Sequence, residues 1–141
     1  MTDKNKLATI ITDPNGTELL VKEAEDLGKS LAQPPGRNSP PLTTSQIRSI
    51  YGEVLRIKAD WLESRDDEAG KKRKARAQRA LILLKPKMAY RAKKEKGRGV
   101  EHLVAVLDPA VDLVKNDKDN FRRFVEFFEA ILAYHKAHGG N

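Results

Sequence analysis

Apolar residues recur at spacings of three and four along nearly the whole chain, and this periodicity constrains the fold more than any other feature. No convincing run alternates β-branched and polar residues, as a half-buried strand would. The clearest helix covers NFRRFVEFFEAILAYHKAHGG, where Gly139 and Gly140 supply a C-terminal stop. One face of this helix collects Phe121, Phe124, Val125, Phe128, Ile131, Leu132 and His135. We therefore predict an all-α protein.

Two further helices have start signals. Thr17 can cap a helix that places Leu20, Ala24, Leu27 and Leu31 on one face. In LTTSQI, Thr43 and Gln46 form a capping box, and Leu42 with Ile47 can staple across it. The helix that follows has a wide core stripe of Ile47, Ile50, Tyr51, Val54, Ile57 and Trp61.

A fourth helical pattern covers about residues 100–115 and has Pro109 inside it, so we expect a kink or two short helices. Its core positions are Leu103, Val106, Leu107, Ala110 and Val114.

The chain is expected to form one domain, a compact bundle of about five helices whose N-terminal helix is loosely tethered. Residues 1–16 are predicted to be a flexible N-terminus, and residues 17–32 a leading helix. Four prolines and a glycine in QPPGRNSPP predict a linker over 33–41 that could let the leading helix dock on a neighbouring molecule. The bundle core is assigned to residues 42–141.

Charge is concentrated in one segment. The net charge is +7, but the stretch from Lys71 to Arg98 carries 13 Lys and Arg against the single acid Glu95. The remainder of the chain has a balance of −5. Such a concentration is typical of a protein that binds a polyanion, although a solvated lysine-rich helix has the same pattern.

The basic segment predicts a helix with two stripes. Leu81, Leu84, Met88 and Ala92 form a core stripe. Lys87, Arg91, Lys94 and Arg98 form an adjoining cationic stripe, with Arg73 and Arg76 near the same line. Pro86 can bend the helix and leave Lys85 and Lys87 on either side of a notch.

On the preceding helix, Arg48 and Arg56 flank Gly52, where another backbone could approach closely. From these patterns we predict phosphate contacts by Arg48, Arg56, Lys85, Lys87, Arg91 and Lys94.

Three further features concern the surface of the protein. KKRK at 71–74 resembles a nuclear-import signal but is more often a flexible surface tract. Tyr90 could stack on a base or pack on a neighbouring helix or subunit. Phe127 and Tyr134 suggest a second packing surface, and with it self-association.

Catalytic chemistry is not evident. His135 and His138 have a spacing that could share a metal, but His135 lies in a core stripe, which favours a core histidine. No nucleophile has a plausible base and orienting group, so we expect no enzyme activity, cofactor or metal. With no cysteine, no signal peptide and no membrane-spanning run, the chain is expected to be soluble and cytoplasmic.

Three segments carry a family resemblance: LTTSQIRSIYGEV at 42–54, LILLKPKMAY at 81–90 and FVEFFEAILAYHKAHG at 124–139. In this order they resemble the small-subunit family of type III-A CRISPR effector complexes, over residues 42–140. The resemblance implies an antiviral, non-catalytic RNA-binding helical protein. Several copies would stack in a minor filament and line the channel for guide RNA and target RNA.

The resemblance also places four cations in motifs that are expected to contact RNA: Arg48, Lys85, Lys87 and Arg91. The expected partners are guide RNA, target RNA and other subunits of the complex. The isolated chain could also be a homodimer. Two alternatives come from the basic segment alone: a free-standing basic helical nucleic-acid-binding protein, or a structural adaptor whose cations meet acidic protein surfaces.

Overall fold

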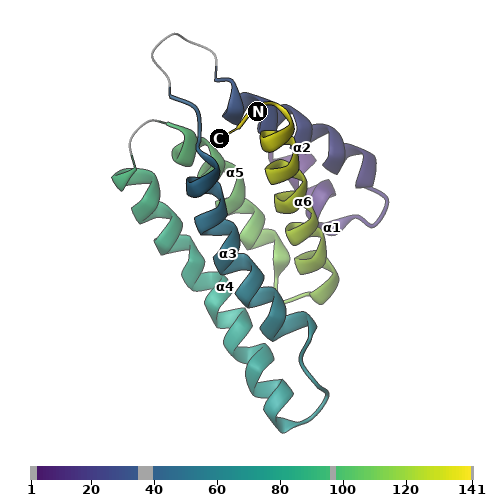
Figure 1. Ribbon diagram of the computed structural model, residues 1–141. Coiled ribbons are helices and arrows are strands. Elements are labelled where there is room, and N and C mark those ends of the chain that lie inside the picture. Colours follow the sequence, from purple (N-terminus) through teal and green to yellow (C-terminus); the bar gives the residue numbers. More distant parts are fainter. Residues whose placement is uncertain (1–2, 35–39, 96–97, 141) are drawn as a thin grey trace.

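The computed structural model describes residues 3–34, 40–95 and 98–140, which form α-helices and no strand (Figure 1). The all-α prediction is confirmed, but these residues form six helices rather than about five. The helices are α1 (Lys4–Thr12), α2 (Thr17–Ala32), α3 (Thr44–Leu62), α4 (Glu68–Lys94), α5 (Gly99–Val114) and α6 (Lys118–Ala137). Across the same residues, every helix is too short or too polar to cross a membrane.

Helix α6 is the centre of the bundle, because it packs against α1, α2, α3 and α5. All four phenylalanines of the chain lie on it and are fully buried. The Trp61 ring of α3 stacks on Phe121 with centroids 4.5 Å apart, and Tyr51 meets Phe128 edge-on at 5.1 Å. Aromatic contacts of this kind add to the free energy of area burial. The core face predicted for this helix is therefore confirmed, with Leu132 only partly buried.

The N-terminus contains a helix that the sequence analysis missed. Residues 1–16 were predicted to be flexible, but Lys4–Thr12 form α1, capped by the Asp3 side chain, which accepts from the Lys6 amide at 2.8 Å. Leu7, Ile10 and Ile11 are buried against the bundle. Arg123 of α6 also donates to the Ile11 carbonyl at 2.7 Å. Burial of this small apolar face against α5 and α6 explains why the segment is ordered.

Helix α2 is packed closely on α6, so the prediction of a loosely tethered leading helix is wrong. A Cβ atom on Gly28 would lie 2.7 Å from the Tyr134 Cβ and 2.8 Å from the His135 amide nitrogen. Glycine is thus required for the approach of the two helices. The chain beyond α2 is also held, since the Leu42 amide donates to the Leu31 carbonyl at 3.0 Å. Residues 35–39 of the predicted linker lie outside the described residues.

The surface that suggested self-association is covered within the chain. Phe127 is fully buried and Tyr134 is partly buried, because α1 and α2 pack on this side of α6. The aromatic side of α6 therefore gives no argument for a second molecule.

Several helix boundaries differ from the predictions. The capping box of Thr43 and Gln46 is confirmed by both of its hydrogen bonds, but the N-cap of α2 is Gly16 rather than Thr17. Helix α5 is one helix through Pro109, so of the two alternatives, a kink or two short helices, the second is wrong and the kink stays a prediction. Helix α4 likewise continues through Pro86. The residues whose carbonyls lose a helical hydrogen bond to these prolines, Ile82 in α4 and Ala105 in α5, are both exposed.

The basic tract is ordered. The N-cap Asp67 accepts from the Gly70 amide at 2.8 Å, and α4 begins at Glu68. The KKRK sequence is therefore helical, and the prediction of a flexible surface tract is wrong. At its other end α4 stops at Lys94, so Arg98 leaves the predicted cationic stripe and becomes the N-cap of α5.

Candidate nucleic-acid interface

The candidate interface lies on the pair formed by α3 and α4, which run antiparallel (Figure 1). Polar contacts follow the seam between the two helices in order. Asp60 meets Arg73 at 3.3 Å, Glu53 meets Lys87 at 3.8 Å, and Gln46 donates to Glu95 at 3.4 Å. These contacts fix the register of the two helices, so cations on both are held at defined relative positions.

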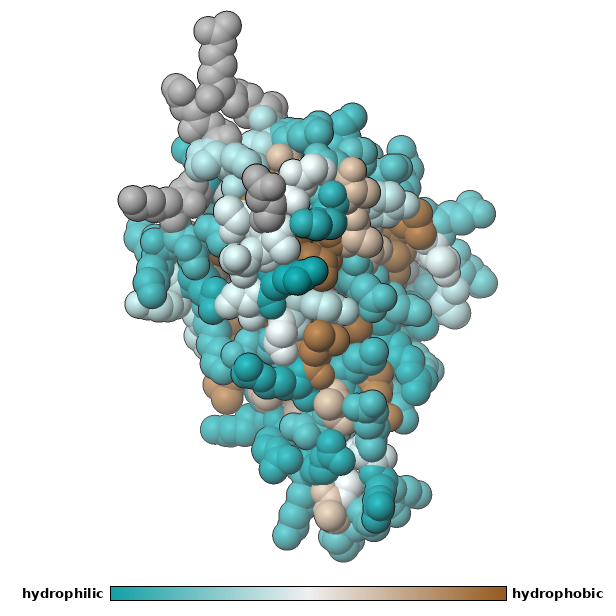
Figure 2. Space-filling view, viewed as in Figure 1, coloured by the Kyte–Doolittle hydropathy of each residue, from teal (hydrophilic) through white to brown (hydrophobic). Residues whose placement is uncertain are grey.

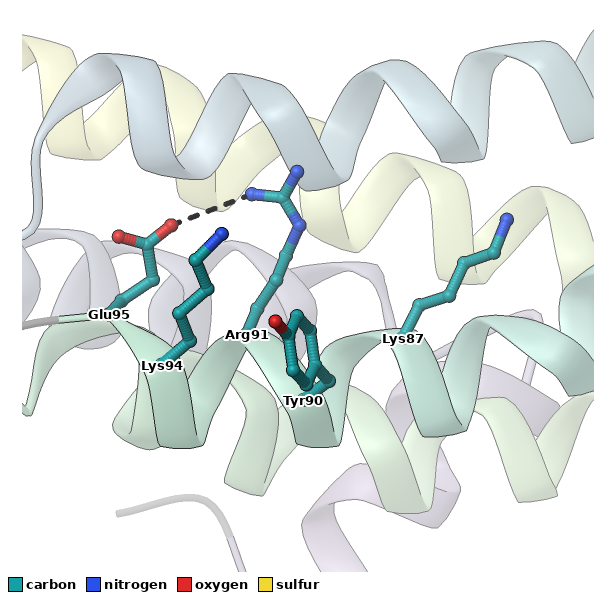
Figure 3. A pocket seen from close by; sticks show the side chains of 5 residues that line it. All are labelled: Lys87, Tyr90, Arg91, Lys94 and Glu95. Atoms are coloured by element: carbon teal, nitrogen blue, oxygen red, sulfur yellow. Dashed lines mark ion pairs between the residues drawn. The ribbon is translucent and has the colours of Figure 1, made fainter.

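A shallow hollow of about 260 Å³ lies along the C-terminal part of α4. It is lined by Lys87, Tyr90, Arg91, Lys94 and Glu95. Figure 3 shows the Lys87, Arg91 and Lys94 side chains extending from α4 in the same general direction, with the Tyr90 ring beside them. The Lys94 ammonium lies 5.8 Å from the centroid of the Tyr90 ring, within the range of a cation–π contact.

Two carboxylates partly neutralise these cations. Glu95 lies 3.8 Å from Arg91, and Glu53 lies between Lys87 and Arg56, whose guanidinium is 3.3 Å away. All of these pairs are at least partly open to solvent, so each is weak and its cation can exchange a carboxylate for another anion. Sequence patterns had not indicated Glu53 as a partner of Lys87, because that pair depends on the register of α3 against α4. The Arg91–Glu95 and Arg56–Glu53 pairs are local, at spacings of four and three residues, and were not considered.

Arg48 and Arg56 project from α3 as exposed side chains. Between them, a Cβ atom on Gly52 would meet nothing within 4 Å, so the surface there is open within this chain. Arg48 has no ion pair among the described residues. Together α3 and α4 present five of the six predicted cations, Arg48, Arg56, Lys87, Arg91 and Lys94, which we call the α3–α4 cationic face.

Lys85 is separated from this face. Its ammonium lies 2.5 Å from Asp112 and 3.8 Å from Asp108, both on α5. The hydrogen bond to Asp112, with attraction by Asp108, raises the pKa of Lys85 above its usual value. Lys85 and Lys87 thus flank Pro86 but turn toward different neighbouring helices, α5 and α3.

The histidine that could have been a metal ligand has another role. His135 is fully buried, and its Nε2 donates to the Leu42 carbonyl at 2.5 Å. A Cβ atom on Gly140 would collide with the imidazole ring, so this glycine lies directly against it. The interpretation as a core histidine is confirmed. In the part of the chain that the structure describes, no group of three or more His, Asp or Glu side chains could hold a metal ion.

Comparison with known proteins identifies one family. The family model described as Csm2 Type III-A matches residues 15–141, which includes α2 through α6 and leaves α1 outside. The match extends beyond the segment at 42–140 that carried the resemblance in the sequence. Neither the comparison with curated proteins nor that with solved structures gave a match.

Proposed function

Because this chain belongs to the Csm2 family and is a subunit of a type III-A CRISPR complex, we propose that it is a non-catalytic subunit that holds RNA by its phosphate backbone. The contact surface is the α3–α4 cationic face. Guide RNA and target RNA are the ligands, and the remaining subunits of the complex supply the chemistry.

The observation that carries this proposal is the excess of exposed positive charge on the α3–α4 cationic face. Its five cations are accompanied by the carboxylates of Glu53 and Glu95 alone among the contacts described for them. Those carboxylates are weak, partly exposed partners that a phosphate can replace. An incoming strand therefore meets a net positive surface whose side chains are already held in register.

The spacing of the cations suits a strand rather than a single anion. Lys87, Arg91 and Lys94 follow each other at intervals of four and three residues, which places successive charges about 5–6 Å apart along one side of α4. Contacts of this kind position a strand without reading its sequence. Pairing between guide and target would supply the sequence specificity, so this subunit needs only shape and charge.

Lys85 is not one of the RNA-binding cations in this proposal. Its partners on α5 are close, so the lysine joins α4 to α5 and contributes little to RNA affinity. In the assembled complex, several copies of the chain would stack head to tail and extend the cationic face into a continuous lining of the RNA channel.

The test is charge reversal within the complex. The variant R48E/K87E/R91E/K94E should still assemble with its partner subunits but lose its share of the contact with guide and target RNA, measured by RNA retention and by crosslinking to this subunit. A matched control, K22E/K29E/K118E/K136E, reverses four lysines outside α3 and α4 and should retain normal crosslinking. Normal crosslinking of the first variant would show that RNA binds elsewhere.

A further inference from the structure

The basic tract at the start of α4 is not used by the α3–α4 cationic face. Residues 71–79 read KKRKARAQR and hold six cations and no acid. Figure 1 shows that this end of the α3–α4 pair extends beyond the ends of α5 and α6. Among the described residues, the helices that pack closely against α4 are α3 and α5, and the space-filling view is largely hydrophilic at this projecting end (Figure 2).

The tract is a rigid array rather than a flexible tail. Asp60 of α3 pairs with Arg73 at 3.3 Å and with Arg76 at 3.7 Å. Ala77 is buried, and a Cβ atom on Gly70 would overlap the Arg65 carbonyl, so the start of the helix is tightly packed. Side chains on such a scaffold lose less conformational entropy when they bind than side chains on a mobile segment.

Three of the cations, Lys72, Arg76 and Arg79, form a line on the exposed side of the helix. They follow each other at spacings of four and three, so their like charges repel. Neither Lys72 nor Arg79 has an ion pair among the described residues. Two acidic residues at the start of α4 already have other partners. Asp67 caps the helix, and Glu68 pairs with Lys71. A bound polyanion would relieve the repulsion.

The line continues toward the α3–α4 cationic face. At 100° and 1.5 Å per residue, Lys72 and Lys94 lie about 40° apart around α4 and about 33 Å apart along it. A stacked strand advances about 3.4 Å per nucleotide, so about ten nucleotides would span this distance. A shorter strand held by the α3–α4 cationic face would not reach Lys72.

Exposed apolar side chains lie between the two groups of cations and beside the second group. Ile82 and Leu83, between Arg79 and Lys87, are 54% and 45% exposed. Tyr90, in the hollow beside Lys87, is 66% exposed. Bases and sugars of an unpaired strand can lie on such side chains, and a tyrosine ring can stack on a base. The backbone of a duplex offers no apolar group to match them, so the surface favours a single strand.

We propose that Lys72, Arg76 and Arg79 form a second phosphate-binding site, which extends the RNA contact along α4 to single-stranded segments of about ten nucleotides or longer. The inference rests on the proposed function, because the strand must also engage the α3–α4 cationic face. The ligand is single-stranded RNA that continues beyond the segment held there.

The experiment measures the affinity of the full-length chain for single-stranded RNAs of about 5 and about 15 nucleotides, chosen to be shorter and longer than the span of α4. The wild-type chain should bind the longer RNA at least about tenfold more tightly at low salt, as three additional exposed ion pairs would allow. The variant K72Q/R76Q/R79Q should lose most of this advantage and bind the short RNA normally. Its slope of log affinity against log salt should be shallower by about 2 for the long RNA only.

A matched control removes the same charge elsewhere. K22Q/K29Q/K136Q replaces three exposed lysines on α2 and α6 and should preserve the preference for long RNA. The inference is wrong if the tract variant retains the preference for long RNA, or if the control loses it equally. Loss of short-RNA binding in R48E/K87E/R91E/K94E tests the α3–α4 cationic face separately, so the two proposals can fail independently.

Discussion

Helices α6 and α4 are both long and amphipathic, but they use their residues differently. In α6, seven of 20 residues are buried, among them four phenylalanines, and four other helices pack around it. In α4, five of 27 are buried and two of those are Gly70 and Ala77. Burial of large apolar side chains supplies most of the free energy of folding. The fold therefore depends on α6, whereas most of the α4 surface is available for binding.

The largest expected effect is on stability and should follow from truncating α6. Phe124→Ala removes a fully buried ring and should lower the free energy of unfolding by about 3–5 kcal/mol. Tyr90→Ala on α4 is the matched control, since its ring is 66% exposed, and it should change stability by less than about 0.5 kcal/mol. Urea unfolding of both variants checks the difference. Equal losses would mean that α4 contributes as much to the core as α6.

The next effect concerns the contact between α2 and α6. Gly28→Val places side-chain atoms against Tyr134 and the α6 backbone, where no flexible group can yield. We expect a loss of about 1–3 kcal/mol, typical of overpacking, measured by thermal unfolding. Gly52→Val is the control, because nothing lies within 4 Å of the added Cβ, and it should be neutral or stabilising. A harmless substitution at Gly28 would mean that α2 is loosely held after all.

A smaller effect separates the two lysines that flank Pro86. Lys87→Ala should weaken binding of a short single-stranded RNA by about threefold and reduce the salt slope by about 0.7, as loss of one exposed phosphate contact would. Lys85→Ala should leave both unchanged, because that ammonium is engaged by Asp112 and Asp108. Equal losses in the two variants would place Lys85 on the RNA-binding surface.

The smallest effect is the dependence of stability on alkaline pH. The folded-state pKa of Lys85 lies above its ordinary value of 10.5, mainly through the hydrogen bond to Asp112. Its contribution to stability is thus fully present below pH 10.5 and is lost as the pH rises through the folded-state pKa. The difference in melting temperature between wild type and Lys85→Met should be larger at pH 8 than at about pH 11. A difference that stays constant would argue against the ion pair.

Sequence patterns predicted the interior of the bundle well because periodicity and capping are local signals. The core positions of α3, α5 and α6, the capping box at Thr43 and the buried His135 all follow from spacing within one helix. Helix α1 was missed because it is short and its three buried residues matter only once α5 and α6 cover them.

The candidate interface was predictable in composition but not in pairing. Spacing along α4 identified the row of Lys87, Arg91 and Lys94. The partners Glu53, Asp108 and Asp112 come from other helices, and their proximity depends on how α3 and α5 are aligned with α4. The close approach of Gly28 on α2 to Tyr134 on α6 is likewise a tertiary contact that no local pattern encodes.

The most direct test of the division between fold and binding surface is the salt dependence of RNA affinity, measured beside thermal unfolding. For a short single-stranded RNA, five phosphate contacts predict a slope of about −3.5 in log affinity against log salt. In R48Q/R56Q/K87Q/R91Q/K94Q the slope should approach zero, while the melting temperature stays within about 5 °C of wild type. An unchanged slope, or loss of cooperative unfolding in this variant, would contradict the account.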